Sequence, residues 1–301
     1  MTHDQAGHVV VERDDGRKLV DVVKDHLGAV AVREVGELLR HGGVLADGEP
    51  GGINHRAVAG TQLMLAPGVL DRLRAAGRVT EPADVALVVV HEDAHLVVVD
   101  KPAGMHVHPL GEHRDGTLVG ALLHRAGVRH DQPWSAWRPH PTHRLDRATS
   151  GLVLVAKHPT TQRAVDLLRA DGQVRRTYRA TVRGRVVQDQ GVVDVPLGRD
   201  PGDDRRRAQV AVADGGQRAR TRYRVVERTA DTTVLEVELE TGRTHQVRAH
   251  LAHLGHPLVG DELYDQAAPR TTSVAIALRA VRLRLPHPVT HELLDLRTTG
   301  T

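Results

Sequence analysis

Residues 143–157 read HRLDRATSGLVLVAK, a cluster of charged side chains followed directly by an apolar run. An acid, Asp146, stands between two arginines, Arg144 and Arg147. Thr-Ser-Gly predicts a turn, because these residues satisfy backbone groups locally. The run GLVLVAK predicts a buried strand that holds this turn rigidly. If the arginines converge on Asp146, they favour its charged form. An ionised acid on a rigid turn can act as a nucleophile or a base. The alternative is an Asp that caps a turn or forms a surface ion pair.

The composition is that of a globular protein, with 301 residues, 40% hydrophobic and 26% charged. This length allows one large domain or two smaller ones. The formal net charge is only +3, from 41 basic and 38 acidic residues, so local patches matter more than the total. Most of the basic residues are arginines, which suit phosphate and base recognition, although a GC-rich coding bias would have the same effect.

The chain has no cysteine, which excludes disulfides, thiolate metal sites and thiol catalysis. The first residues, MTHDQAGHVVVERDDGRK, contain no apolar signal core, and no run approaches the length of a membrane span. We therefore expect a soluble, cytoplasmic protein without membrane association.

Two domains are predicted. Residues 1–80 form a small N-terminal domain, with two helices in RKLVDVVKDHL and VAVREVGELLRHGG and two short strands in VLAD and TQLMLAP. Residues 68–84 are interpreted as a linker or a short surface helix, and residues 85–301 as the second domain.

The second domain alternates many strands with a few helices, which predicts the α+β class. ALVVVHEDAHLVVVDKPAG indicates a hairpin, and helices are expected in TLVGALLHRAG, HPTTQRAVDLLRADG and HQVRAHLAHLG. Strands are expected in GLVLVAK, RRTYRATVRGRVV, AQVAVA, ARTRYRVVER, TVLEVELE and SVAIALRAVRLRL. The mixed-charge segment 198–208 is interpreted as a solvated hairpin tip.

A second polar cluster lies in residues 238–264, ELETGRTHQVRAHLAHLGHPLVGDELY. Its arginines and histidines are Arg243, His245, Arg248, His250, His253 and His256. A glycine turn that leads into a helix N-terminus can hold an anion such as phosphate. The rival is a metal-dependent hydrolase built on the histidines, although no short zinc motif with a Glu is present. For His253 and His256 we favour ordinary hydrogen bonds to the backbone.

Tyr178 in RRTYRA is a third candidate, because basic residues flank it on a predicted strand. A tyrosine there could stack on a base while Arg175, Arg176 and Arg179 lie near the phosphates. The alternative is a half-buried tyrosine with a structural role.

Five segments in one order resemble the RluA-type RNA pseudouridine synthases: VVDKPAG, HRLDRATSGL, RRTY, ETGRTHQVRAHL and LGHPLVGDELY. The resemblance covers roughly residues 85–290, and QRARTRYRV at 217–225 resembles the family's Ala-x-Thr-x-Tyr strand. It implies a catalytic domain with a mixed, mainly antiparallel sheet. It also implies an isomerase that turns uridine in RNA into pseudouridine, without cofactor or metal. The N1–C1′ bond breaks, the uracil turns, and C5 bonds to C1′.

The resemblance also implies the catalytic residues. Asp146 is the catalytic acid, ionised and able to form an adduct or ion pair; attack at the ribose and attack at the base both stay open. Tyr178 is expected to stack on the target base and to help remove the C5 proton. Arg248 is expected to pair with Asp146.

The substrate-binding residues implied are Arg144, Arg243, His245 and Leu278. Arg144 would contact RNA beside the flipped base, and Leu278 would pack beneath the site. Since the target base must leave its stack, we expect an electropositive cleft.

Residues 1–80 resemble the small RNA-binding module shared with a ribosomal small-subunit protein, except that its usual Ser-Arg step is replaced by AVAVREV. A degenerate module would contribute less to RNA affinity. The expected partner is ribosomal large-subunit RNA first and transfer RNA second, bound by a monomer. The alternative is a non-catalytic RNA-binding protein that keeps the fold.

Overall fold

The computed structural model describes residues 9–10, 16–27, 32–69, 72–73, 83–109, 115–127, 139–265 and 275–298. The chain forms two compact units. The first contains Met1–Ala86, His108–His140 and Ala156–Pro159, and the second contains Leu87–Val107, Pro141–Val155 and Thr160–Thr301. Most of the predicted linker, 68–84, lies outside the described residues, so the domain boundary between 80 and 85 stays a prediction. No helix in the described ranges is both long and apolar enough to span a bilayer.

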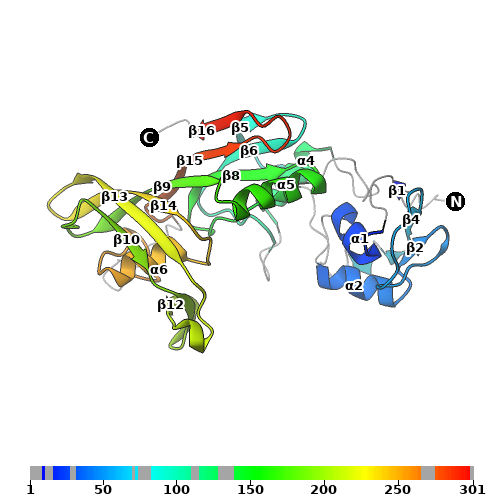
Figure 1. The fold of residues 1–301 in the computed structure, drawn as a ribbon, viewed down its shortest axis with the longest axis horizontal. Helices are drawn as coiled ribbons and strands as arrows, with labels where there is room; N and C mark the ends of the chain where they lie inside the picture. Colours follow the sequence, from blue (N-terminus) through cyan, green and yellow to red (C-terminus); the bar gives the residue numbers. More distant parts are fainter. Residues whose placement is uncertain are drawn as a thin grey trace. The chain divides into compact units, whose positions relative to one another are not determined.

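The first unit contains the two predicted helices, α1 (Leu19–Leu27) and α2 (Val32–Arg40). Its small sheet has the order β1-β4-β2-β3, and Figure 1 labels most of these strands. β2 (Val44–Ala46) and β4 (Gln62–Leu65) were predicted, whereas β1 (Val9–Val10) and β3 (Glu49–Pro50) are too short to show periodicity. Apolar residues from both helices and both predicted strands form its core, including Leu19, Val22, Val35, Leu39, Val44, Leu63 and Leu65.

The same unit contains helix α4 (Leu118–Arg125), which was predicted from its apolar spacing. The Thr117 hydroxyl caps its N-terminus by accepting a hydrogen bond from Gly120 N at 3.1 Å. Gly127, just beyond the C-terminus, has a φ of +65°, as expected for a glycine that ends a helix.

The second unit is built on a ten-stranded sheet, with the order β10-β13-β14-β9-β15-β8-β6-β5 and with β16 beside β15 and β7 beside β8 (Figure 1). The pairs β10–β13, β13–β14, β14–β9, β9–β15, β15–β16 and β5–β6 are antiparallel, while β8 runs parallel to β15. This mixed, mainly antiparallel sheet with few helices confirms the predicted α+β class.

The strands of this sheet are β5 (Val88–Glu92), β6 (Leu96–Lys101), β7 (His140–Pro141), β8 (Ser150–Ala156), β9 (Arg175–Arg183), β10 (Gln190–Asp194), β13 (Arg220–Arg228), β14 (Thr232–Leu239), β15 (Leu278–Pro286) and β16 (Leu293–Arg297). Helices α5 (Pro159–Ala170) and α6 (Gln246–His253) agree with their predicted ranges. β7, β10 and β16 were not predicted.

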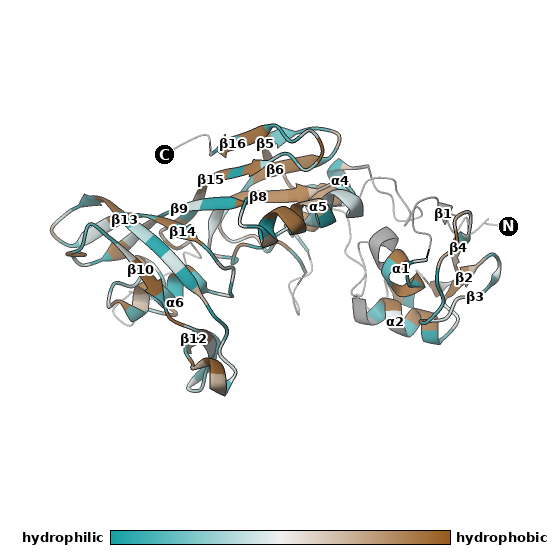
Figure 2. Cartoon of the chain, in the orientation of Figure 1, coloured by the Kyte–Doolittle hydropathy of each residue, from teal (hydrophilic) through white to brown (hydrophobic). Residues whose placement is uncertain are grey.

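Strand β8 is buried along both faces, from Gly151 to Ala156. Side chains of a strand alternate between faces, so a continuous apolar run belongs to a strand covered on both sides. Figure 2 shows this contrast: β6 and β8 are hydrophobic, whereas β9 and β13 carry many hydrophilic residues. The run in the opening segment is therefore a central strand, and the turn before it has a rigid base.

The prediction for segment 198–208 was wrong in detail. β11 (Leu197–Asp200) and β12 (Asp203–Gln209) form a two-stranded ribbon, and only Pro201 and Gly202 separate them. The predicted strand AQVAVA is broken instead, because a 3₁₀ turn occupies Val212–Asp214. Both faces of this ribbon carry charged side chains, so the segment lacks the alternation of apolar and polar residues that indicates a strand.

We expect Gly151→Ala to lower the free energy of unfolding by about 2–3 kcal/mol or more, because positive φ and a backbone clash combine. Gly151 has a φ of +113°, and a Cβ there would lie 2.3 Å from the Ala280 carbonyl oxygen on β15. Gly172→Ala is the matched control: its φ is +70° but no atom lies within 4 Å, so about 1 kcal/mol is expected. Urea unfolding measures both. Equal losses of stability in the two variants would show that the close approach of Ala280 adds nothing to the cost of Gly151→Ala.

Candidate functional site

One cavity of about 520 Å³ lies in the second unit. The turn before β8, residues of β9, and the segment from the end of β14 into α6 supply most of its lining, and α5 and β15 add Arg169 and Leu278. All seven predicted site residues are among its lining, namely Arg144, Asp146, Tyr178, Arg243, His245, Arg248 and Leu278. The fold thus brings together residues that are about a hundred positions apart in the sequence.

The turn that carries Asp146 is fixed from two sides. Thr149 N donates to the Asp146 carbonyl at 3.1 Å, which closes the turn. The Arg147 carbonyl accepts from Gly104 N at 2.7 Å, and Arg147 Nε donates back to the Gly104 carbonyl at 3.1 Å. Lys101 Nζ donates to the carbonyls of Pro102 and Met105, both at 2.8 Å, and lies 3.5 Å from that of Arg147.

The two arginines that flank Asp146 do not converge on it, which corrects the expectation from the sequence. Arg147 is engaged with Gly104, and Arg144 is exposed at the cavity. Within the described part of the chain, Asp146 forms an ion pair with Arg248 at 3.3 Å, and the His245 ring lies 3.8 Å from the same carboxylate oxygen. Side chains of neighbouring residues in a turn point in different directions, so adjacency in sequence did not produce contact.

Arg248 is the centre of the polar arrangement and is only 8% exposed. Its Nε and Nη2 donate to the two carboxylate oxygens of Asp261, both at 2.7 Å, and its Nη1 donates to Asp146 Oδ2 at 3.3 Å. Burial by itself would lower the pKa of Arg248, but the hydrogen bonds and charge of Asp261 and the charge of Asp146 raise it above its ordinary value. Arg248 therefore stays charged beside Asp146.

Asp261 was not among the predicted site residues. It is 1% exposed and holds Arg248 through a bidentate pair, whereas Asp146 receives the remaining donor. The one available signal was its place in the segment LGHPLVGDELY, which contributed to the family resemblance without suggesting a role for this acid.

A buried amide organises the loop that leads into α6. Gln246 Oε1 accepts from the Thr241 hydroxyl at 2.8 Å and from Arg243 N at 2.9 Å. Gln246 Nε2 donates to the Arg220 carbonyl and to Thr221 Oγ1, both at 3.0 Å. His245 has a φ of +56°, a left-handed conformation that costs about 1 kcal/mol or more outside glycine. This set of bonds holds Arg243 and His245 at the cavity.

Tyr178 and Leu278 contribute from neighbouring strands, since β9 and β15 are paired. Tyr178 lines the cavity and is only 3% exposed. It is therefore more deeply buried than the half-buried structural tyrosine that was the alternative. Burial raises the pKa of the Tyr178 phenol and the charge of Asp146 raises it further, while Arg176 opposes both. The phenol is therefore protonated near neutral pH and offers a flat face and a hydroxyl.

The histidines of the second cluster do not converge on one point. His250 uses both ring nitrogens, with Nδ1 2.8 Å from Thr221 Oγ1 and Nε2 2.9 Å from the Val195 carbonyl. His256 Nδ1 lies 2.9 Å from the Arg183 carbonyl. Across the described ranges, no group of three His, Asp or Glu side chains is arranged to hold a metal ion. The described residues therefore offer no set of metal ligands for the metal-dependent hydrolase.

We expect the buried Lys101 to make stability depend on pH. Burial lowers the pKa of Lys101 from 10.5 to about 8, although the charge of Asp146 opposes the shift. Between these two values the unfolded chain keeps a proton that the folded chain has lost, so stability rises with pH. This contribution is complete above 10.5 and is lost as the pH falls through 8. Urea unfolding from pH 7 to 10.5 should show the rise in the native protein relative to Lys101→Met. If the free energies of unfolding of the native protein and of Lys101→Met changed with pH in parallel, the prediction would be wrong.

The fold is that of pseudouridine synthases. Human RNA Pseudouridylate Synthase Domain Containing 4 superposes with a TM-score of 0.56 and 26% identity, over 77% of this chain and 92% of that one. The family model for RNA pseudouridylate synthases matches residues 95–253, and the chain belongs to this family.

Several similar proteins carry the name ribosomal large subunit pseudouridine synthase D, among them the following two. The protein of Xanthomonas campestris pv. campestris is 37% identical over 290 residues, which are 95% of this chain and 84% of the relative. The protein of Nitrosomonas europaea is 43% identical over 219 residues, which are 70% of this chain. That match spans 61% of the Nitrosomonas protein, less than two thirds of its length.

Proposed function

We propose that this protein is an RNA pseudouridine synthase that converts uridine to pseudouridine in ribosomal large-subunit RNA. The observation that carries the proposal is the shared cavity of Asp146, Tyr178 and Arg248, with Arg248 Nη1 3.3 Å from Asp146 Oδ2. The names of the two bacterial relatives support ribosomal RNA as the first substrate to test, with transfer RNA second.

The chemistry is an isomerisation that needs an ionised acid, and Arg248 keeps a positive charge beside Asp146. Asp146 supplies the negative charge, as a nucleophile or as an ion-pair partner, while the N1–C1′ bond breaks. The uracil turns, C5 bonds to C1′, the C5 proton is lost and N1 gains a proton. Tyr178 supplies the surface on which the base stacks and a hydroxyl near the proton to be removed.

The cavity suits a nucleotide that has left its stack. Its volume of about 520 Å³ lies in the range of small-molecule sites, and five arginines line it against two acidic residues. Such a lining attracts phosphates and repays part of the cost of unstacking the target base. We assign Arg144 and Arg243, which line the cavity, to contacts with the strand beside that base, and Leu278 to packing against the base.

The same proposal gives residues 1–80 a share in RNA binding and places a monomeric enzyme in the cytoplasm. Two helices against a small sheet are compatible with the RNA-binding module that this segment resembles. Removing the segment would then weaken binding to long RNA more than it changes the chemical step.

The experiment uses RNA with tritium at uridine C5, because pseudouridine formation releases that tritium to water. The full-length protein is incubated with large-subunit and transfer RNA transcripts, and the modified position is mapped by chemical labelling. Release from a defined uridine supports the proposal. Salt-dependent RNA binding without release from either RNA would favour the non-catalytic RNA-binding protein instead.

A further inference from the structure

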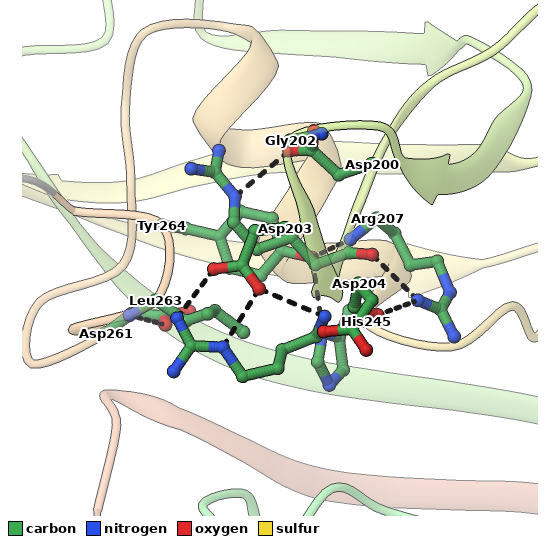
Figure 3. A network of polar contacts seen from close by, with 11 residues as sticks. Asp200, Gly202, Asp203, Asp204, Arg207, His245, Asp261, Leu263 and Tyr264 are labelled. Atoms are coloured by element: carbon green, nitrogen blue, oxygen red, sulfur yellow. Dashed lines mark hydrogen bonds and ion pairs between the residues drawn. The ribbon is translucent and has the colours of Figure 1, made fainter.

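The hydroxyl of Tyr264 links the β11–β12 ribbon to the candidate active site. Arg207 N, on β12, donates to Tyr264 Oη at 2.7 Å. Tyr264 Oη lies 3.2 Å from His245 Nδ1, and His245 Nε2 lies 3.8 Å from Asp146 Oδ2. Figure 3 shows Tyr264 between Arg207 and His245. Three successive contacts therefore connect the backbone of an exposed ribbon to the acid at the centre of the site.

The Tyr264 ring also orders the groups around it. It is 7% exposed, and its centroid lies 5.1 Å from the guanidinium carbon of Arg248 and 5.2 Å from that of Arg206. The His245 ring meets it edge to face, with centroids 5.8 Å apart and an interplanar angle of 80°. Cations and ring edges are both attracted to the electron-rich face of a phenol ring.

The contacts at Tyr264 Oη bear on the tautomer of His245. The oxygen accepts the Arg207 N–H and keeps a proton of its own, and the 3.2 Å contact is a hydrogen bond to His245 Nδ1 when that proton is donated to the ring. Nδ1 is then unprotonated, and Nε2 carries the hydrogen and directs it toward Asp146. The opposite tautomer would direct a lone pair at the carboxylate, which is repulsive.

The surroundings keep His245 neutral. Burial lowers the pKa of His245 below its ordinary value, and the charges of Arg248 and Arg207 lower it further. The charges of Asp146 and Asp261 act in the opposite direction without reversing the shift. A neutral ring can support the Asp146 charge through an N–H without adding a second cation, so the carboxylate keeps its reactivity.

We propose that Tyr264 is a positioning residue for the proposed synthase reaction: its hydroxyl holds His245 in the tautomer that directs Nε2–H at Asp146, and it couples this arrangement to the β11–β12 ribbon. The kinetic part of this inference rests on the proposed function. The tautomer itself does not, and it can be measured without RNA.

The test is nitrogen NMR of full-length protein labelled with ¹⁵N-histidine, in which a His245→Gln variant identifies the His245 signals. We expect hydrogen on Nε2 alone in the native protein and a mixture of tautomers in Tyr264→Phe, which keeps the ring but lacks the donor. In tritium release, Tyr264→Phe should lose about tenfold in kcat with little change in KM. The acidic limb of its pH profile should move upward, because His245 becomes easier to protonate.

Two further sets of variants separate positioning from simple structural support. Tyr223→Phe removes the hydroxyl of another buried tyrosine, outside the cavity lining, and should leave both readouts unchanged. Arg207→Pro and Arg207→Ala both remove the guanidinium, but only Arg207→Pro also removes the N–H that donates to Tyr264 and points away from β11. Arg207→Pro should therefore show the same mixture of tautomers as Tyr264→Phe, and Arg207→Ala should not.

Hydrogen on His245 Nδ1 in the native protein would overturn the proposal. So would a His245 spectrum that is the same in native protein and Tyr264→Phe. If the native protein shows the expected tautomer but releases no tritium from any RNA, the proposed function fails while the positioning of His245 stands.

Discussion

An Asp146→Asn protein is expected to lose pseudouridine formation by about 10⁴-fold or more and to remain folded. Asn has nearly the same shape as Asp, but it is neutral and cannot form the adduct or ion pair that the reaction needs. Folding should survive because Arg248 keeps its two hydrogen bonds to Asp261 when the charge at 146 is lost. Single-turnover tritium release measures the chemical step, and urea unfolding measures the fold.

Glu240→Gln is the matched control, since Glu240 is the other acid in the cavity lining. Its carboxylate is paired with Arg220 and Arg222 on β13 and not with Arg248. We expect less than a tenfold change in the same assay, because exposed ion pairs contribute little. Asp146→Asn activity within tenfold of the native protein would remove Asp146 from its proposed role, whatever the control shows.

The sequence predicted those parts of the fold that depend on local pattern. The apolar run after Gly151 became strand β8, and the spacing of HPTTQRAVDLLRADG became helix α5. The contact of Asp146 with Arg248 spans 102 residues, so no local rule could reveal it. Only the resemblance to a family of known chemistry suggested that these residues meet, and the shared cavity agrees with that expectation.

The residues that sequence reasoning missed are those whose partners depend on tertiary geometry. Arg147 was grouped with Asp146 because they are neighbours, but the turn directs it to the Gly104 carbonyl. Asp261 lies in a tight turn closed by backbone hydrogen bonds, and its carboxylate meets Arg248 of α6. Tyr264 was not among the predicted site residues, because nothing in the sequence places it against β12.

Asp261→Asn is expected to lower the free energy of unfolding by about 3–5 kcal/mol, because it leaves a buried guanidinium without its main partner. Asp261 is 1% exposed, and both its oxygens accept from Arg248 at 2.7 Å. An Asn side chain offers one acceptor and turns an N–H₂ group toward donors. Asp295→Asn is the control: its partner Arg282 is on the surface, so a much smaller loss of stability is expected.

Activity should fall with stability in Asp261→Asn, but for a different reason than in Asp146→Asn. With Asp261 neutralised, Asp146 is the one carboxylate among the described residues that still pairs with Arg248, and the guanidinium should turn toward it. A tighter pair holds the carboxylate more strongly and makes it a weaker nucleophile, so the chemical step slows even in molecules that remain folded. Measuring tritium release at low temperature, where the variant is folded, separates this effect from unfolding. Native activity under those conditions would show that Asp261 only stabilises the fold, and an unfolding curve like that of Asp295→Asn would show that Arg248 does not depend on Asp261 for its burial.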